Sequence, residues 1–139
     1  MRLHPTIILT CIWLLGCGAP YPQEVPPQNG RVALSWTLDG AFLTTERCQA
    51  ERIEFMEVEV RSLTGPAQIG FTHVQCDLDR YSIAMAPLGR VLLRVGALGR
   101  DARGAPCLRR YGEATAVAGT AYPDRPTRVE LSVRSDGCR

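Results

Sequence analysis

The feature that most constrains the fold is an alternation of apolar and polar residues that recurs in short segments separated by turn signals. It is clearest in residues 31–38, whose apolar members are Val32, Leu34, Trp36 and Leu38. A period of two places these side chains on one face of a half-buried strand. The Asp39-Gly40 pair that follows favours a turn.

Similar segments follow along the chain, at residues 53–60, 71–76, 81–85, 91–97, 107–110, 113–122 and 127–134. In residues 53–60 the inward parity changes at Phe55-Met56, which predicts a β-bulge. Strict alternation in residues 127–134 places Val129, Leu131 and Val133 inside. About seven strands without a long amphipathic helix predict an all-β chain that folds as a single antiparallel β-sandwich of Ig-like layout. One short helix is expected at residues 44–51, with a Thr as N-cap and Cys48 pointing inward.

The N-terminus has a different character, because Met1-Arg2 is followed by an apolar run that ends at Leu14-Leu15-Gly16-Cys17. This arrangement predicts a secretory signal peptide over residues 1–16. A membrane-spanning helix needs about 20 apolar residues, and a series of prolines interrupts the run too early, at Pro20, Pro22, Pro26 and Pro27. With an ordinary cleaved signal peptide, Cys17 would remain as a free thiol outside the cell.

The four residues Leu14-Leu15-Gly16-Cys17 resemble the lipobox of bacterial lipoproteins. The resemblance implies that the Cys17 thiol carries a diacylglyceryl group and that Cys17 becomes the first residue after cleavage. Gly18, in place of the Asp that retains enteric-type lipoproteins in the inner membrane, implies the outer membrane. Residues 17–30 would then form a lipidated, Pro-rich tether that could hold the domain, residues 31–139, about 40 Å from the lipid surface.

The charge of the chain is nearly balanced, with 16 basic residues, all of them Arg, and 14 acidic residues. No global field therefore attracts the protein to nucleic acid. Aromatic residues make up only 6% of the chain, and they do not interleave with basic residues as in a base-stacking surface. We expect no nucleic-acid partner.

The order of features over residues 31–134 resembles small β-sandwich domains of bacterial lipoproteins, described as transthyretin-like or carboxypeptidase-regulatory-like. The shared features are a Trp-bearing first strand, Cys48 after a turn, a Val-rich strand, Cys76, and a strand that runs into a polar Gly turn. Cys107 and Cys138 depart from that pattern and imply an additional cross-link.

Four cysteines remain in the expected domain, and an oxidising compartment favours disulfides over free thiols. A zinc site is disfavoured because no two of them form a close ligand pair such as C-x-x-C. Four cysteines allow three connectivities. The resemblance implies the Cys48–Cys76 pair, which leaves Cys107–Cys138.

Candidate catalytic and metal-binding residues are few, and each has a simpler interpretation. His73 is the only histidine after the signal peptide, and no G-x-S-x-G elbow accompanies it. Glu57 and Glu59 share a strand face and could be paired acids, but solvated positions explain them more simply. Asp77 and Asp79 are too few for a calcium site, and a plain turn is favoured. The sequence therefore predicts no catalytic residue, no metal and no cofactor.

The densest positive cluster flanks a Gly-rich turn and consists of Arg100, Arg103, Arg109 and Arg110. Arginine pairs bidentately with phosphate and carboxylate, so the cluster is a candidate anion-binding patch. A solvated loop in a chain that uses only Arg is the alternative.

These observations predict a non-enzymatic, lipid-anchored cell-envelope protein whose sandwich is a structural or binding module. Its partners would be the membrane, through the anchor, and either an envelope protein or an anionic glycan. An accessory subunit of a secretion, motility or surface-assembly complex is the alternative. An unrecognised hydrolase ranks last, because the sequence assembles no pocket for one.

Overall fold

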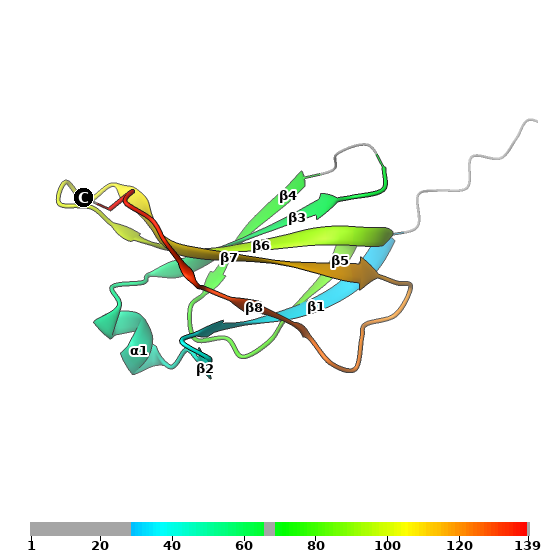
Figure 1. Cartoon of the computed structure of the whole chain (residues 1–139), viewed down its shortest axis with the longest axis horizontal. Helices are drawn as coiled ribbons and strands as arrows, with labels where there is room; N and C mark the ends of the chain where they lie inside the picture. The colour runs from blue at the N-terminus through cyan, green and yellow to red at the C-terminus, as the bar shows by residue number, and fades with distance from the viewer. Residues whose placement is uncertain (1–28, 66–68, 139) are drawn as a thin grey trace, which may run out of the picture.

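The computed structural model describes residues 29–65 and 69–138, which contain nine strands and one short helix (Figure 1). In chain order they are β1 (Asn29–Leu38), β2 (Ala41–Phe42), α1 (Thr45–Ala50), β3 (Phe55–Ser62), β4 (Ile69–Gln75), β5 (Tyr81–Pro87), β6 (Gly89–Arg100), β7 (Pro106–Ala118), β8 (Thr127–Glu130) and β9 (Val133–Arg134). The predicted signal peptide, Cys17 and the tether up to residue 28 lie outside the described residues.

The strands form two sheets, so the predicted all-β sandwich is confirmed. In the first sheet β1 pairs with β2, β5 and β8, and the second has the order β4-β3-β6-β7-β9. All pairs are antiparallel except one, since β8 runs parallel to β1 with Val129 opposite Trp36. Near one end, Arg31 of β1 and Gly119 after β7 exchange backbone hydrogen bonds of 2.7 and 3.3 Å. These bonds tie the two sheets together on the β7 side.

The core lies between the sheets, where the apolar faces of β1, β3, β6 and β8 meet. Its largest fully buried side chains are Trp36, Leu34, Leu38, Met56, Leu93 and Leu131. The Trp36 indole Nε1–H donates to the carbonyl oxygen of Cys76 at 2.9 Å. Trp36 therefore fills the core and satisfies a backbone acceptor on the segment that leaves β4.

The outer face of β1 is also covered, whereas the sequence predicts a half-buried strand. Ala33, Ser35 and Thr37 are at most 2% exposed. The Thr37 hydroxyl donates to the carboxylate of Glu130, and the Arg80 guanidinium donates to the carbonyl oxygens of residues 123 and 124. Glu130 of the neighbouring strand β8 supplies one of these polar contacts, which a local alternation pattern does not reveal.

The β-bulge predicted at Phe55-Met56 is wrong. Ile53 lies before β3, and its N–H donates to the Cys48 carbonyl at 2.8 Å. From Phe55 onward β3 pairs in unbroken register with both β4 and β6. Phe55 faces outward, with its ring 4.7 Å from the ring of His73. The change of parity marks the start of the strand and not an irregularity within it.

The last predicted strand, residues 127–134, is divided between the two sheets. The Leu131 N–H donates to the Thr37 carbonyl at 2.8 Å, after which the chain crosses over and β9 pairs with β7. Val129 and Leu131 are buried as expected, but Val133 is 40% exposed, so its inward placement is wrong. The segments predicted at 107–110 and 113–122 form one continuous strand, β7, which ends at Ala118.

The helix and both cross-links are confirmed. Thr44 caps α1, because its hydroxyl oxygen accepts the Arg47 N–H at 3.2 Å. Cys48 on the buried side of α1 bonds to Cys76 after β4. The second disulfide joins Cys107 at the start of β7 to Cys138 near the C-terminus. One bridge therefore secures α1 to the sandwich, and the other secures the segment after β9.

Candidate anion-binding site

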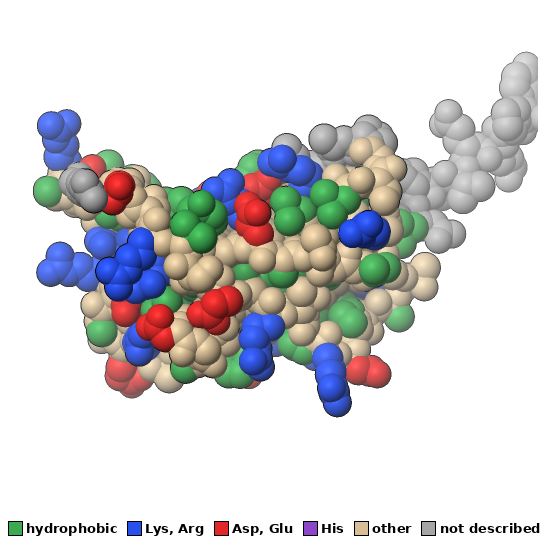
Figure 2. All heavy atoms as spheres, viewed as in Figure 1, with side chains coloured by type: hydrophobic (Ala, Val, Ile, Leu, Met, Phe, Trp, Pro, Cys, Tyr) green, Lys and Arg blue, Asp and Glu red, His purple; other side chains and the backbone are tan. Residues whose placement is uncertain are grey.

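Arginines gather at the end of the sandwich where α1 and the β6–β7 hairpin lie, at the left of Figure 2. We call this region the arginine end. Three residues of the predicted patch, Arg100, Arg109 and Arg110, lie close together there. The fourth, Arg103, lies on the hairpin turn, whose backbone N–H groups at residues 103 and 105 donate to Asp101. Two arginines that the sequence did not single out, Arg52 and Arg134, line the same surface.

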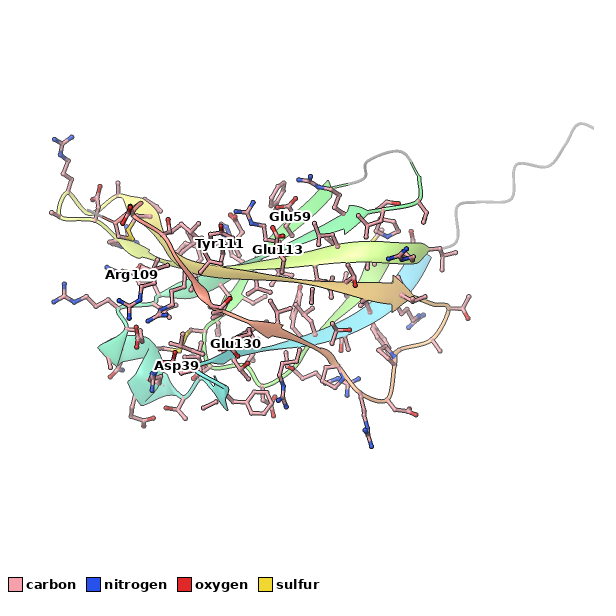
Figure 3. The ribbon with its side chains drawn as sticks, viewed as in Figure 1. Asp39, Glu59, Arg109, Tyr111, Glu113 and Glu130 are labelled. Carbon is pink, nitrogen blue, oxygen red and sulfur yellow. A yellow bond between two sulfur atoms is a disulfide. The ribbon has the colours of Figure 1, made fainter. Side chains whose placement is uncertain are left out.

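A β-bulge directs Arg109 into this surface. On β6, Ala97 pairs with Arg110 and Leu98 with Leu108, so Arg109 is the extra residue of β7. A bulge turns the extra side chain out of the normal alternation. The Arg109 guanidinium, labelled in Figure 3, crosses Gly99 and donates through Nη2 to the Arg100 carbonyl at 3.0 Å.

Gly99 makes this path possible. A Cβ atom at residue 99 would lie 2.2 Å from Nε of Arg109 and 2.3 Å from the carbonyl oxygen of Arg52. Both distances are far below van der Waals contact, so only glycine fits. The Nε atom of Arg109 is buried and has no hydrogen-bond partner within the described residues. Gly99 therefore leaves room for the Arg109 side chain, and the Arg100 carbonyl fixes its guanidinium.

The arginines of this end differ in how far carboxylates neutralise them. Nε of Arg100 lies 3.0 Å from Glu54, and Nη2 of Arg110 lies 3.6 Å from Glu51. Arg109 has no carboxylate partner and donates only to the Arg100 carbonyl. The side chains of Arg52, Arg103 and Arg134 make no hydrogen bond or ion pair with any described residue. These positive charges remain available to an anion.

Two hollows flank Arg109, and both are lined by arginine. One of about 380 Å³ contains Arg52 and Arg100, together with Gln49 and Glu54. The other, of about 230 Å³, is lined by Glu51, Arg109, Arg110, Arg134 and Ser135. Guanidinium groups present several N–H donors in a plane that suits carboxylate, sulfate or phosphate. The pair of hollows can therefore receive two anionic groups side by side.

The other predicted site residues lie elsewhere and are engaged in pairs. His73 Nε2 lies 3.1 Å from Glu57 Oε2 on the outer face of the second sheet. Glu59 is not solvated as expected, because it is only 8% exposed and its carboxylate accepts from Arg61 at 2.7 Å. Asp77 accepts from the Thr45 hydroxyl at 2.6 Å. Among the described residues, no three His, Cys, Asp or Glu side chains are grouped so that they could hold a metal ion.

The acidic residues of the outer face belong to a charge ladder across three strands. Glu59 on β3 lies opposite Arg94 on β6, which in turn lies opposite Glu113 on β7. Nε of Arg94 is 3.7 Å from Glu113, and its guanidinium covers the Tyr111 ring at 4.9 Å. Figure 3 shows Glu59, Tyr111 and Glu113 close together on this face. Alternating charges of this kind stabilise strand pairing.

On α1, hydrogen bonds from its own backbone N–H and from the Thr44 side chain lower the pKa of the Glu46 carboxyl below 4.5. Glu46 is fully exposed. A carboxylate in the first turn interacts favourably with the helix dipole, so this pKa shift reflects capping of α1.

A third hollow, of about 500 Å³, lies between edge strands β4 and β5. It is lined mainly by apolar side chains, namely Val58, Val60, Phe71, Tyr81, Ile83, Met85 and Pro87, with Gly70 and Thr72. The molecule thus carries an apolar seam in addition to its arginine end.

The chain matches no known protein family, and neither the curated proteins nor the solved structures include one that is significantly similar to it. The resemblance to lipoprotein sandwich domains thus stays a prediction. Across the described ranges, no helix has the length and apolarity needed to cross a membrane.

Proposed function

We propose that this is a non-enzymatic, lipid-anchored envelope protein of the outer membrane whose sandwich binds an anionic polymer, such as an acidic glycan, through its arginine end. The observation that carries this proposal is the position of the arginine end relative to Asn29, where β1 begins. The two lie at opposite ends of the same long sandwich (Figure 1).

The register of the strands gives the scale of this separation. Asn29, where the described chain begins, pairs with Pro87, two residues before β6 starts at Gly89. β6 then runs to Arg100 at the other end. At about 3.3 Å per residue, β6 spans roughly 35 Å. A lipid anchor at Cys17 would therefore be attached at the end of the domain opposite the arginines.

The chemistry of the arginine end suits a polymer with repeated negative charges. Arg109 lies between two hollows, and unneutralised arginines extend the surface on both sides, with Arg52 in one hollow and Arg134 in the other. One chain with regularly spaced carboxylates or sulfates would engage both hollows at once, and the second contact would form at a high effective concentration.

The anchor is tested by replacement of Cys17 with Ser in the full chain, followed by fractionation of the cells. The lipidated protein should be found in the membrane fraction, and the Cys17→Ser variant should be released. If the variant stays in the membrane fraction, the anchor is refuted.

The binding site is tested with the lipidated protein in mild detergent against polygalacturonate and dextran sulfate, with uncharged dextran as the reference polymer. The double variant Arg109→Ala/Arg134→Ala should bind the charged polymers about tenfold more weakly, since each charged hydrogen bond contributes about 1.5–3 kcal/mol before solvent screening. Arg125→Ala, an exposed arginine away from this end, is the matched control. Equal affinities of the two variants, or no binding by the unmodified protein, would refute the site.

A further inference from the structure

The end of the sandwich opposite the arginines exposes a cluster of large apolar side chains, here called the seam patch. Its members are Leu63, Phe71, Met85 and Leu88, which are 46%, 62%, 76% and 37% exposed. Leu63 lies close to Leu88, because its N–H donates to the Arg90 carbonyl at 2.9 Å, and Pro87, next to Leu88, lines the apolar hollow. Phe71 and Met85 line the apolar hollow between β4 and β5.

The charge around the seam patch is mainly basic. The surrounding stretches contain no Asp or Glu, as positions 29–33, 60–65, 69–76, 82–92 and 114–123 show. They do contain Arg31, Arg61 and Arg90. On the adjacent strand β3, Glu59 and Glu57 are acidic, and they pair with Arg61 and His73. Arg90 makes no side-chain bond with any residue in the described part of the chain.

Strand β1 begins at the same end. Asn29 pairs with Pro87, the residue immediately before Leu88. Cys17 precedes Asn29 by twelve residues, and a chain of that length spans at most about 40 Å. If Cys17 carries a lipid, the seam patch is the part of the domain that the tether keeps nearest to the bilayer.

We infer that the seam patch docks on an anionic lipid bilayer, so that the domain stands on the membrane with its arginine end outermost. Apolar side chains next to arginines, with the neighbouring carboxylates already paired, suit the boundary between acyl chains and anionic headgroups. Each arginine near such a surface contributes about 1 kcal/mol of attraction. The anchor adds a high local concentration, so weak surface affinity is sufficient. This inference rests on the proposed lipid anchor.

The segment before β1 is a poor alternative occupant of the hollow. A strand added along β5 would need regularly spaced backbone N–H donors, and proline has none. Four of the residues between Cys17 and Asn29 are prolines, at positions 20, 22, 26 and 27. A second copy of the chain is the other possible occupant, and the experiment below distinguishes it from lipid.

Two methionines make the test internal to the protein, because Met85 lies in the seam patch and Met56 is fully buried in the core. The full-length lipidated protein is reconstituted in vesicles of phosphatidylethanolamine with phosphatidylglycerol, and separately in phosphatidylcholine alone. Oxidation by hydrogen peroxide is followed at each methionine by mass spectrometry. Docking should slow oxidation of Met85 by about tenfold in the anionic vesicles relative to the zwitterionic ones, and Met56 should react slowly in both.

A charged substitution provides the matched comparison. Leu63→Glu/Leu88→Glu should restore oxidation of Met85 in anionic vesicles, because both sites are exposed and the new carboxylates repel the surface. Phe42→Glu changes a similarly exposed apolar residue of β2, which pairs with the far end of β1, and should leave Met85 protected.

Three results would overturn the inference. If the protein floats with both kinds of vesicle but Met85 reacts equally in each, docking is refuted and the anchor stands. If the protein does not float with vesicles, the anchor fails and the inference fails with it. If protection of Met85 follows protein concentration and not lipid composition, a second copy covers the seam patch.

Discussion

Replacement of Trp36 by Phe tests the connection between the core and the segment that leaves β4. Trp36 is fully buried, and its Nε1–H donates to the Cys76 carbonyl. Phenylalanine keeps most of the apolar contact but leaves this buried acceptor without its donor. Cys76 also forms the disulfide with Cys48 of α1, so loss of this hydrogen bond affects the attachment of the helix.

The magnitude follows from two contributions. A buried carbonyl that loses its partner costs about 1–3 kcal/mol. The smaller ring vacates roughly 40 Å³, which at about 24 cal/mol per Å³ adds about 1 kcal/mol. The free energy of unfolding should therefore fall by about 2–4 kcal/mol. For a domain of this size, that corresponds to a decrease in Tm of about 8–16 °C.

Urea unfolding followed by far-UV circular dichroism is the suitable assay, because Trp36 is the only tryptophan after residue 16 and the variant loses the fluorescence signal. The control is Val117→Ala on the exposed face of β7, where the side chain is 70% exposed and a change within about 0.5 kcal/mol is expected. A Trp36→Phe variant that is equally close to the unmodified protein would refute the assignment of Trp36 as a core residue with a required hydrogen bond.

Three further variants test the features around α1 and the arginine end. Gly99→Ala places a Cβ against Nε of Arg109, so it should lower Tm and weaken binding of dextran sulfate together; unchanged binding would show that the path of Arg109 does not matter. Cys107→Ser/Cys138→Ser removes a disulfide with a sequence separation of 31 residues and should lower the free energy of unfolding in urea by about 3–4 kcal/mol. It should also weaken polymer binding, because Arg134 of β9 is then held less firmly. An unchanged affinity would show that β9 takes no part in binding. Thr44→Ala should lower the free energy of unfolding by about 1 kcal/mol and raise the pKa of Glu46. The lowered pKa of Glu46 stabilises the folded state above the unfolded pKa, and this contribution is lost as pH falls through the folded pKa. If the Glu46 pKa measured by NMR is the same in the variant, the capping role is contradicted.

The period-two pattern predicted most strands because side-chain direction along a strand is a local property. In residues 127–134, where the alternation is regular, it placed Val129 and Leu131 correctly but failed at Val133. There the Thr37 carbonyl accepts the Leu131 N–H, and the chain leaves β1 for β7. That change of sheet depends on a strand nearly a hundred residues earlier, which no local pattern can reveal.

The arginine end was predictable in part. The cluster around residues 100–110 is contiguous in sequence and stayed together in the fold. Arg52 and Arg134 were missed because tertiary structure alone brings them to β7. One local signal was present: the doublet Arg109-Arg110 interrupts the alternation of β7 at the position of the bulge. Gly99 would have supported it, since glycine in a strand often permits a close approach.

The orientation of β1 also determines how the protein would respond to tension. A pull between the N-terminal segment and a ligand held at the arginine end acts along the axis of β1. Hydrogen bonds to β5 on one side and to the parallel β8 on the other lie across that axis. The load is then shared by all of these bonds in shear and does not open them one at a time. A molecule stretched between a membrane and a polymer would therefore resist detachment through the rate of forced unfolding, which is a kinetic property separate from its equilibrium stability.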